Sequence, residues 1–290
     1  MKTRLHFCRT AFAFGLLLIV LPAFLAAQSA GRVEFTARVA PTGGRPEPVR
    51  QLTFYLLIKS LDDIRIEVLQ TDPAPGLAKF IDALTVSPEL KIWMKKHDSV
   101  QLAGEDFIKS LTPDDIMDVP EFFSAYMSRN MGFKGAGFPE PKFKASDREA
   151  HPEKFKQQKD EYMAAIRNFI SMSPETIEGI DADLAKINPY VKWEYLISDQ
   201  RKRLEDRTNE LAQQLYLAAQ TDTDLDGHGS FANLAPGNYW ISMIGIQAIS
   251  GDVRLRWDVP VTVRPGATTR VELTNLNAAK PNNTVQNSSH

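Results

Sequence analysis

Two blocks of alternating apolar and polar residues stand near opposite ends of the chain. Residues 33–39 alternate with the period of two that marks a strand with one face in a core. Residues 253–263 show the same alternation. Over residues 71–219, between the blocks, the alternation is absent. A fold for this chain must therefore join two strand-forming segments that lie far apart in the sequence.

Each block contains more than one predicted strand. A loop rich in proline and glycine at 41–48 separates the first strand from a second apolar run at 52–58. The sequence also predicts a short strand at 64–69. In the C-terminal block, strands are predicted at 231–234, 238–246, 253–263 and 269–273.

The middle of the chain carries the signals of helix starts. Three motifs, beginning at Ser87, Thr112 and Ser173, each place a hydroxyl residue before a proline and an acid. The hydroxyl accepts an orphan amide proton, the proline needs no donor in the first turn, and the acid faces the positive end of the helix dipole. A capping box is predicted from Ser146 to Glu149.

The longest predicted helix runs from about 189 to 219, because apolar residues recur every seven positions from Ile197 to Ala218. Polar residues, Gln200 among them, stand where a coiled coil has its second apolar row. We therefore expect a helix packed within its own domain.

Neither strand block can form a complete core by itself, because each would leave open sheet edges. Together they supply about seven strands, the number in many β-sandwiches. The predicted class is α+β: an antiparallel, seven-stranded sandwich of the Greek-key type, formed by 31–70 and 220–276 and interrupted by an all-helical insertion at 71–219.

The segment 221–245 reads TDTDLDGHGSFANLAPGNYWISMIG. It resembles the carboxypeptidase regulatory-like domains, which are transthyretin-like β-sandwiches in which T-D-x-D-G leads into x-F-x-x-L-x-P-G-x-Y. The matching residues are Thr223, Asp224, Asp226, Gly227, Phe231, Leu234, Pro236, Gly237 and Tyr239. The resemblance implies the fold of the strand blocks but no activity, since such sandwiches are accessory parts of peptidases, glycan-acting enzymes, adhesins and outer-membrane receptors. These domains normally lack a helical insertion.

The first residues predict export. Basic residues precede an apolar run that ends in small residues, the layout of a signal peptide, which we assign to 1–27. We expect the mature protein to be periplasmic, on the cell surface or secreted, without a membrane span. The only cysteine, Cys8, lies within the signal peptide, so the mature chain would form no disulfide. At the other end, the polar segment 277–290 is predicted to be a disordered tail.

The charge balance argues against some partners. The chain has 34 Lys and Arg against 36 Asp and Glu, a net charge of −2. A protein that binds nucleic acid or an anionic membrane carries a basic excess, so neither partner is expected.

The candidate metal ligands are Asp222, Asp224 and Asp226, which alternate before Gly227 as in the start of a calcium loop. Asn233 stands where the full motif has its bidentate Glu, and the same residues also suit the polar turn of a hairpin. A calcium site and a polar hairpin turn both fit these residues, and calcium is the one cofactor that the sequence indicates.

No sequence motif commits the chain to catalysis: H-E-x-x-H, G-x-S-x-G and phosphate-binding loops are all absent. Trp240 alternates out of step with its neighbours and is a candidate for a sugar-binding outer face. We therefore expect an exported, non-catalytic binding protein whose partner is an envelope protein or a glycan, with its contact surface on the insertion. The alternatives are a carbohydrate-binding module and a hydrolase whose site lies in the insertion.

Overall fold

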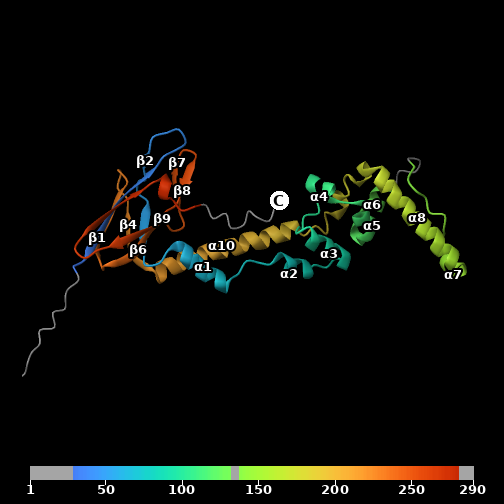
Figure 1. Cartoon of the computed structure of the whole chain (residues 1–290), viewed down its shortest axis with the longest axis horizontal. Helices are drawn as coiled ribbons and strands as arrows, with labels where there is room; N and C mark the ends of the chain where they lie inside the picture. Colours follow the sequence, from blue (N-terminus) through green and yellow to red (C-terminus); the bar gives the residue numbers. More distant parts are fainter. Residues whose placement is uncertain (1–28, 132–136, 281–290) are drawn as a thin grey trace, which may run out of the picture.

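The computed structural model describes residues 29–131 and 137–280. The predicted signal peptide and the tail from residue 281 lie outside the described residues. The fold is α+β, as predicted: within the described ranges, ten α-helices form a central insertion flanked by N- and C-terminal strands that pair mostly antiparallel. Figure 1 shows an elongated molecule with the sheets at one end, most of the helices at the other, and α10 running between them.

The strands form three sheets. One contains β1 (Gly31–Val39), β2 (Glu47–Pro48), β5 (His228–Leu234) and β10 (Thr268–Leu273), with β1 between β5 and β10. The second has the order β4 (Leu217–Asp222), β3 (Thr53–Leu57), β6 (Gly237–Ser242) and β9 (Asp258–Val263). A small hairpin joins β7 (Ala248–Ser250) to β8 (Val253–Leu255).

The two four-stranded sheets share one hydrophobic core. Phe35 of β1 lies 4.9 Å from Phe54 of β3 between ring centroids, and 5.6 Å from Phe231 of β5. Trp257, fully buried, packs beside Phe54 and donates a hydrogen bond of 2.9 Å from Nε1 to the carbonyl of Thr274. The first and last strand blocks therefore complete one core, which neither could form alone.

Strand pairing departs from the prediction in one place: β1 and β10 are parallel. The chain leaves β9 in the second sheet and crosses to the first sheet through a turn at Gly266, whose φ is 62°. Strand β10 therefore runs parallel to β1 instead of antiparallel to it. The strand predicted at 253–263 is also divided, because β8 pairs with β7 and β9 pairs with β6.

The helices of the insertion are short except for two. They are α1 (Leu61–Thr71), α2 (Leu77–Asp82), α3 (Pro88–Lys96), α4 (Glu105–Ser110), α5 (Pro113–Asp118), α6 (Pro120–Asn130), α7 (Asp147–Ala150), α8 (Pro152–Met172), α9 (Asp181–Leu184) and α10 (Tyr190–Gln214). Two 3-10 helices, η1 (Pro174–Ile177) and η2 (Asn275–Asn277), complete the described elements.

Two of the four predicted helix caps are confirmed. Ser87 caps α3 by accepting a hydrogen bond from the amide of Leu90, and Thr112 forms a capping box with Asp115 at α5. The motif at Ser173 opens the 3-10 helix η1 instead of an α-helix. The predicted capping box at Ser146 is wrong, since the Ser146 side chain makes no capping hydrogen bond to α7.

The strand predicted at 64–69 is wrong, because these residues belong to α1. Ile64, Ile66 and Val68 alternate in sequence like a strand, but Ile66 is exposed while Ile64 and Val68, one helical turn apart, are buried. Ser60 begins the helix by accepting a hydrogen bond from the amide of Asp63.

The predicted end of the long helix is also wrong. The helix ends at Gln214, a turn follows at 215–216, and residues 217–219 belong to β4, which pairs with β3. Sheet pairing here outweighs a weak helical preference. At the C-terminus, residues 277–280 of the predicted tail are described, and the amide of Ala279 donates to the carbonyl of Arg256 at 2.8 Å.

Among the described residues, no helix combines the length and the apolar character needed to cross a bilayer.

Candidate functional site

The predicted metal ligands lie beside a shallow groove on the outer face of the first sheet. The groove has a volume of about 600 Å³, and its lining includes Glu34, Asp222, Asp224, His228, Arg270 and Glu272. The structure thus brings Asp222 and Asp224 to one surface. Asp226 lies in the adjoining turn and does not line the groove.

The carboxylate of Asp224 is engaged by its own turn. One oxygen accepts hydrogen bonds from the backbone amides of Asp226, at 2.9 Å, and His228, at 2.8 Å. These backbone donors, His228 first, hold the pKa of Asp224 below its ordinary value. The neighbouring Asp222 accepts a hydrogen bond of 2.6 Å from the hydroxyl of Thr53.

The turn also explains the glycine that follows these acids. Gly227 has a φ of 81°, and a Cβ there would lie 2.5 Å from the carbonyl oxygen of Ala37. Only glycine fits this conformation and this approach of β1. Across the described ranges, no group of three or more His, Cys, Asp or Glu side chains is arranged to hold a metal ion. Calcium binding by Asp222, Asp224 and Asp226 stays a prediction.

Trp240 faces away from the main core, as its alternation predicts, but helices lie over that face of the second sheet. It is partly buried in a separate small core that contains Leu57, Ile64, Ala212 and Ile244. Helices α1 and α10 supply Ile64 and Ala212. The ring therefore packs under helices and does not form part of an open sheet face.

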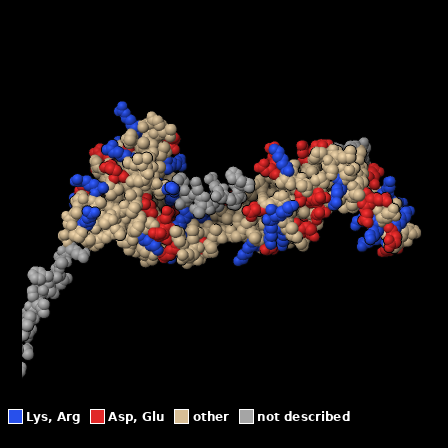
Figure 2. Space-filling view, viewed as in Figure 1, with Lys and Arg blue, Asp and Glu red and all other residues tan. Residues whose placement is uncertain are grey.

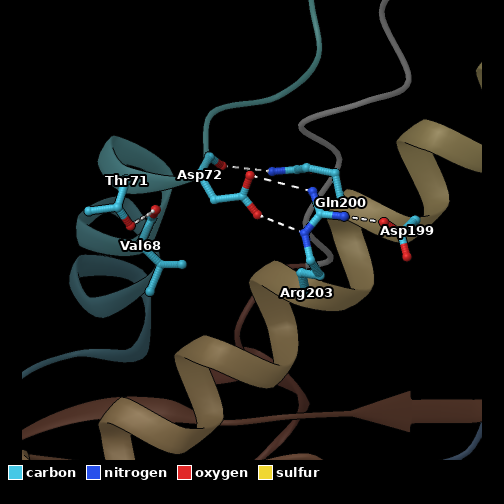
Figure 3. A network of polar contacts seen from close by, with 6 residues as sticks. All are labelled: Val68, Thr71, Asp72, Asp199, Gln200 and Arg203. Atoms are coloured by element: carbon cyan, nitrogen blue, oxygen red, sulfur yellow. Dashed lines mark hydrogen bonds and ion pairs between the residues drawn. The ribbon is translucent and has the colours of Figure 1, made fainter.

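The chain passes from α1 to helices α2–α9 at Asp72 and returns to the sheets along α10. Polar contacts hold these two segments together where they pass each other (Figure 3). Arg203 of α10 makes an ion pair with Asp72, just after α1, at 3.1 Å from Nε to Oδ2, and a second with Asp199. Gln200, almost fully buried, donates a hydrogen bond of 3.0 Å to the backbone carbonyl of Asp72. We call Asp72, Gln200 and Arg203 the clasp.

Beyond the clasp, the helices have a hydrophobic core of their own. Its buried side chains run from Ile81 to Leu184, and among the described residues it shares none with the two cores at the sheets. Trp93 lies at its centre, edge-on to Phe107 and Phe122 at centroid distances of 5.6 and 5.1 Å. We call residues 77–193 the helical module.

The surface of the helical module carries exposed apolar side chains on three of its helices. Ile92 of α3 is 66% exposed, Met172 of α8 is 75% exposed, and Val191 of α10 is 78% exposed. Tyr195 lies one helical turn beyond Val191 and is also exposed. Exposed apolar groups of this kind can be covered by a partner protein.

A second cavity, of about 400 Å³, lies where α1 and α10 meet the sheets. It is lined by parts of α1 and α10, by Met243, by residues 256–258 at the start of β9, and by residues 279 and 280. We call it the junction cavity. No sequence motif marks it, because its lining comes from segments far apart in the chain.

Comparisons with protein-family models, with curated proteins and with solved structures found no match to this chain. The resemblance of residues 221–245 to the carboxypeptidase regulatory-like pattern is therefore a prediction that rests on the sequence motif alone.

Proposed function

We propose that this chain is an exported, non-catalytic binding protein. In this proposal, a seven-stranded, Greek-key sandwich of the carboxypeptidase regulatory-like type forms a scaffold, and the helical module contacts a protein of the cell envelope. Seven of the ten described strands have five or more residues, and these seven include β4, which was not predicted, in place of the strand predicted at 64–69. The signal-peptide pattern of residues 1–27 supports the export.

The observation that carries the proposal is the separation of the two main cores. The helical module is stabilised by its own buried side chains and stands away from the sheets at the end of α10 (Figure 1). Helix α10 has 25 residues, which corresponds to about 37 Å. A module built in this way adds nothing to the core of the sandwich, so its surface is free to evolve for contact with a partner.

The groove lies on the sheets, and the junction cavity lies where α1 and α10 meet them, so neither lies within residues 77–193. The covered position of Trp240 favours a protein partner over a glycan held on the outer sheet face.

The clasp brings residues 72 and 200 close together, so the proposal can be tested by deleting the residues between them. The side chain of Gln200 lies 3.0 Å from the carbonyl of Asp72, so residues 73–199 can be replaced by a short Gly-Ser linker. This deletion keeps the sheets, α1 and the half of α10 that packs on the sheets. We expect the shortened chain to fold and to lose capture of an envelope protein that the full chain retains after cross-linking.

A matched control removes acids from the groove, with Asp222→Asn and Glu272→Gln in the full chain, and should leave capture unchanged. The proposal fails if the shortened, folded chain captures the same protein as the full chain, or if the full chain captures none.

A further inference from the structure

The junction cavity is lined by residues from five separate segments of the chain. On α10, the lining residues Arg201, Leu204, Glu205 and Thr208 follow the spacing of one helix face. Arg65 on α1 lines the same cavity. The cavity therefore depends on the packing of α1 and α10 against the sheets. Figure 2 shows basic and acidic side chains close together at this end of α10.

The cavity has more basic groups than acceptors for them. Arg65 and Arg201 form no ion pair and no hydrogen bond with a carboxylate within the described residues. Arg256, only partly exposed, lies 3.7 Å from Glu205, which is a long ion pair. Lys280 adds a fourth basic side chain to the lining.

The acids of the cavity are largely engaged elsewhere. Asp258 accepts hydrogen bonds from the Ser242 hydroxyl at 2.6 Å and from the amide of Leu61, the first residue of α1, at 2.8 Å. Its two oxygens are thus directed at Ser242 and the start of α1. Burial, the largest effect, raises the pKa of Asp258. Glu205 faces Arg256, which leaves Asp62 as the remaining lining acid.

The rest of the lining is apolar or neutral. Leu61, which is partly exposed, and Ala279, which is exposed, supply apolar surface that is open to a ligand, and Asn209 contributes an amide that makes no hydrogen bond within the described ranges. A volume of about 400 Å³ lies within the size range of small-molecule sites. Guanidinium groups bind carboxylates through paired hydrogen bonds, and an apolar wall holds the body of such a ligand.

We propose that the junction cavity binds a small organic carboxylate with an apolar body. The carboxylate lies between Arg65 and Arg201, and the apolar part lies against Leu61 and Ala279. This inference does not depend on the proposed partner of the helical module. The ligand would connect α1 to α10, so its binding would stabilise the packing of this helix pair on the sheets.

The test is calorimetric titration of the full chain at low ionic strength with two probes, 2-naphthoate and octanoate. Their uncharged amides, 2-naphthamide and octanamide, serve as ligand controls. The test variant is the double substitution Arg65→Gln and Arg201→Gln. Its matched control, Arg45→Gln and Arg264→Gln, removes two exposed arginines elsewhere with the same change in charge. Circular dichroism establishes that both variants are folded.

We expect at least one carboxylate to bind, its amide to bind much more weakly, and the test variant to lose about tenfold or more in affinity. The control variant should bind as the original chain does. Binding should also slow hydrogen exchange of the amides in 61–71 and 201–209. The inference is overturned if neither carboxylate binds at millimolar concentration, if acids and amides bind equally, or if the two double variants have equal affinity.

Discussion

The tryptophans Trp240 and Trp257 lie on opposite sides of the second sheet. Trp257 is fully buried in the core shared by the two large sheets, whereas Trp240 is partly exposed beneath α1 and α10. We expect Trp257→Ala to lower the free energy of unfolding by about 3–5 kcal/mol, through lost burial and a residual cavity. Trp240→Ala should lower the free energy of unfolding by less than about 2 kcal/mol. Urea unfolding measures both, and equal costs would contradict the burial described.

Asp224 offers a prediction about pH. Its pKa is lowered in the folded chain by amide hydrogen bonds from His228 and Asp226. The ionised form therefore stabilises the folded state above the unfolded pKa, and this contribution is lost as the pH falls toward the folded pKa. Carboxyl NMR titration should place Asp224 below the ordinary aspartate value, whereas an ordinary or higher value would show that the turn is not formed in solution.

The same NMR experiment also tests calcium binding by the three aspartates. If Asp222, Asp224 and Asp226 bind the ion, adding calcium should shift all three carboxyl resonances and raise the melting temperature, and a chelator should reverse both changes. If these residues serve only the hairpin turn, neither quantity should change.

At the scale of elements, the strand pattern in the sequence carries much of the information about the sheets. Phe35 lies in the alternating residues 33–39 and Phe54 in the apolar run 52–58, and both are buried in the shared core. Helix α1 could not be predicted in this way, since Ile64, Ile66 and Val68 fit a strand equally well. Only the position of α10 beside it decides which of these side chains is buried, and that position depends on contacts far along the chain.

The clasp predicts a local effect on α1. Gln200→Leu removes the donor to the carbonyl of Asp72, and Arg203→Ala removes the ion pair with its carboxylate. We expect the double variant to accelerate hydrogen exchange at the end of α1, with a change in global stability of about 1–2 kcal/mol at most, since one contact is an exposed ion pair. Arg207→Ala, which removes only a pair within α10, is the control. Equal exchange at residues 66–72 in both variants would show that the clasp does not order α1.

At the scale of the whole molecule, the separate cores predict separate unfolding. Phe122→Ala should lower the stability of the helical module alone, and Phe54→Ala that of the sheets alone, each by about 3–5 kcal/mol. Hydrogen exchange followed by mass spectrometry measures the two regions in one sample. A single transition that moves as a unit in both variants would show that the two cores are coupled.

The sequence predicted the α+β class and the central helical insertion, because strand and helix periods differ over long stretches. It could not predict the junction cavity or the clasp. Arg65, Arg201 and Arg256 become neighbours only when α1 and α10 pack on the sheets, and no local pattern relates residues so far apart. The alternating acids identify Asp222 and Asp224 as candidates, but the hydrogen bond from Thr53 to Asp222 and those from the turn to Asp224 follow only from the three-dimensional structure.

Site-specific photo-cross-linking of the full chain in its native envelope tests whether the helical module contacts an envelope protein. A photoreactive residue is placed at Ile92 or Met172 on the helical module and, as the control, at Ile249 on β7, which is 63% exposed. We expect the two positions on the module to give an adduct with the same envelope protein and position 249 to give none. An adduct formed only from position 249, or no adduct from either position on the module, would contradict this expectation.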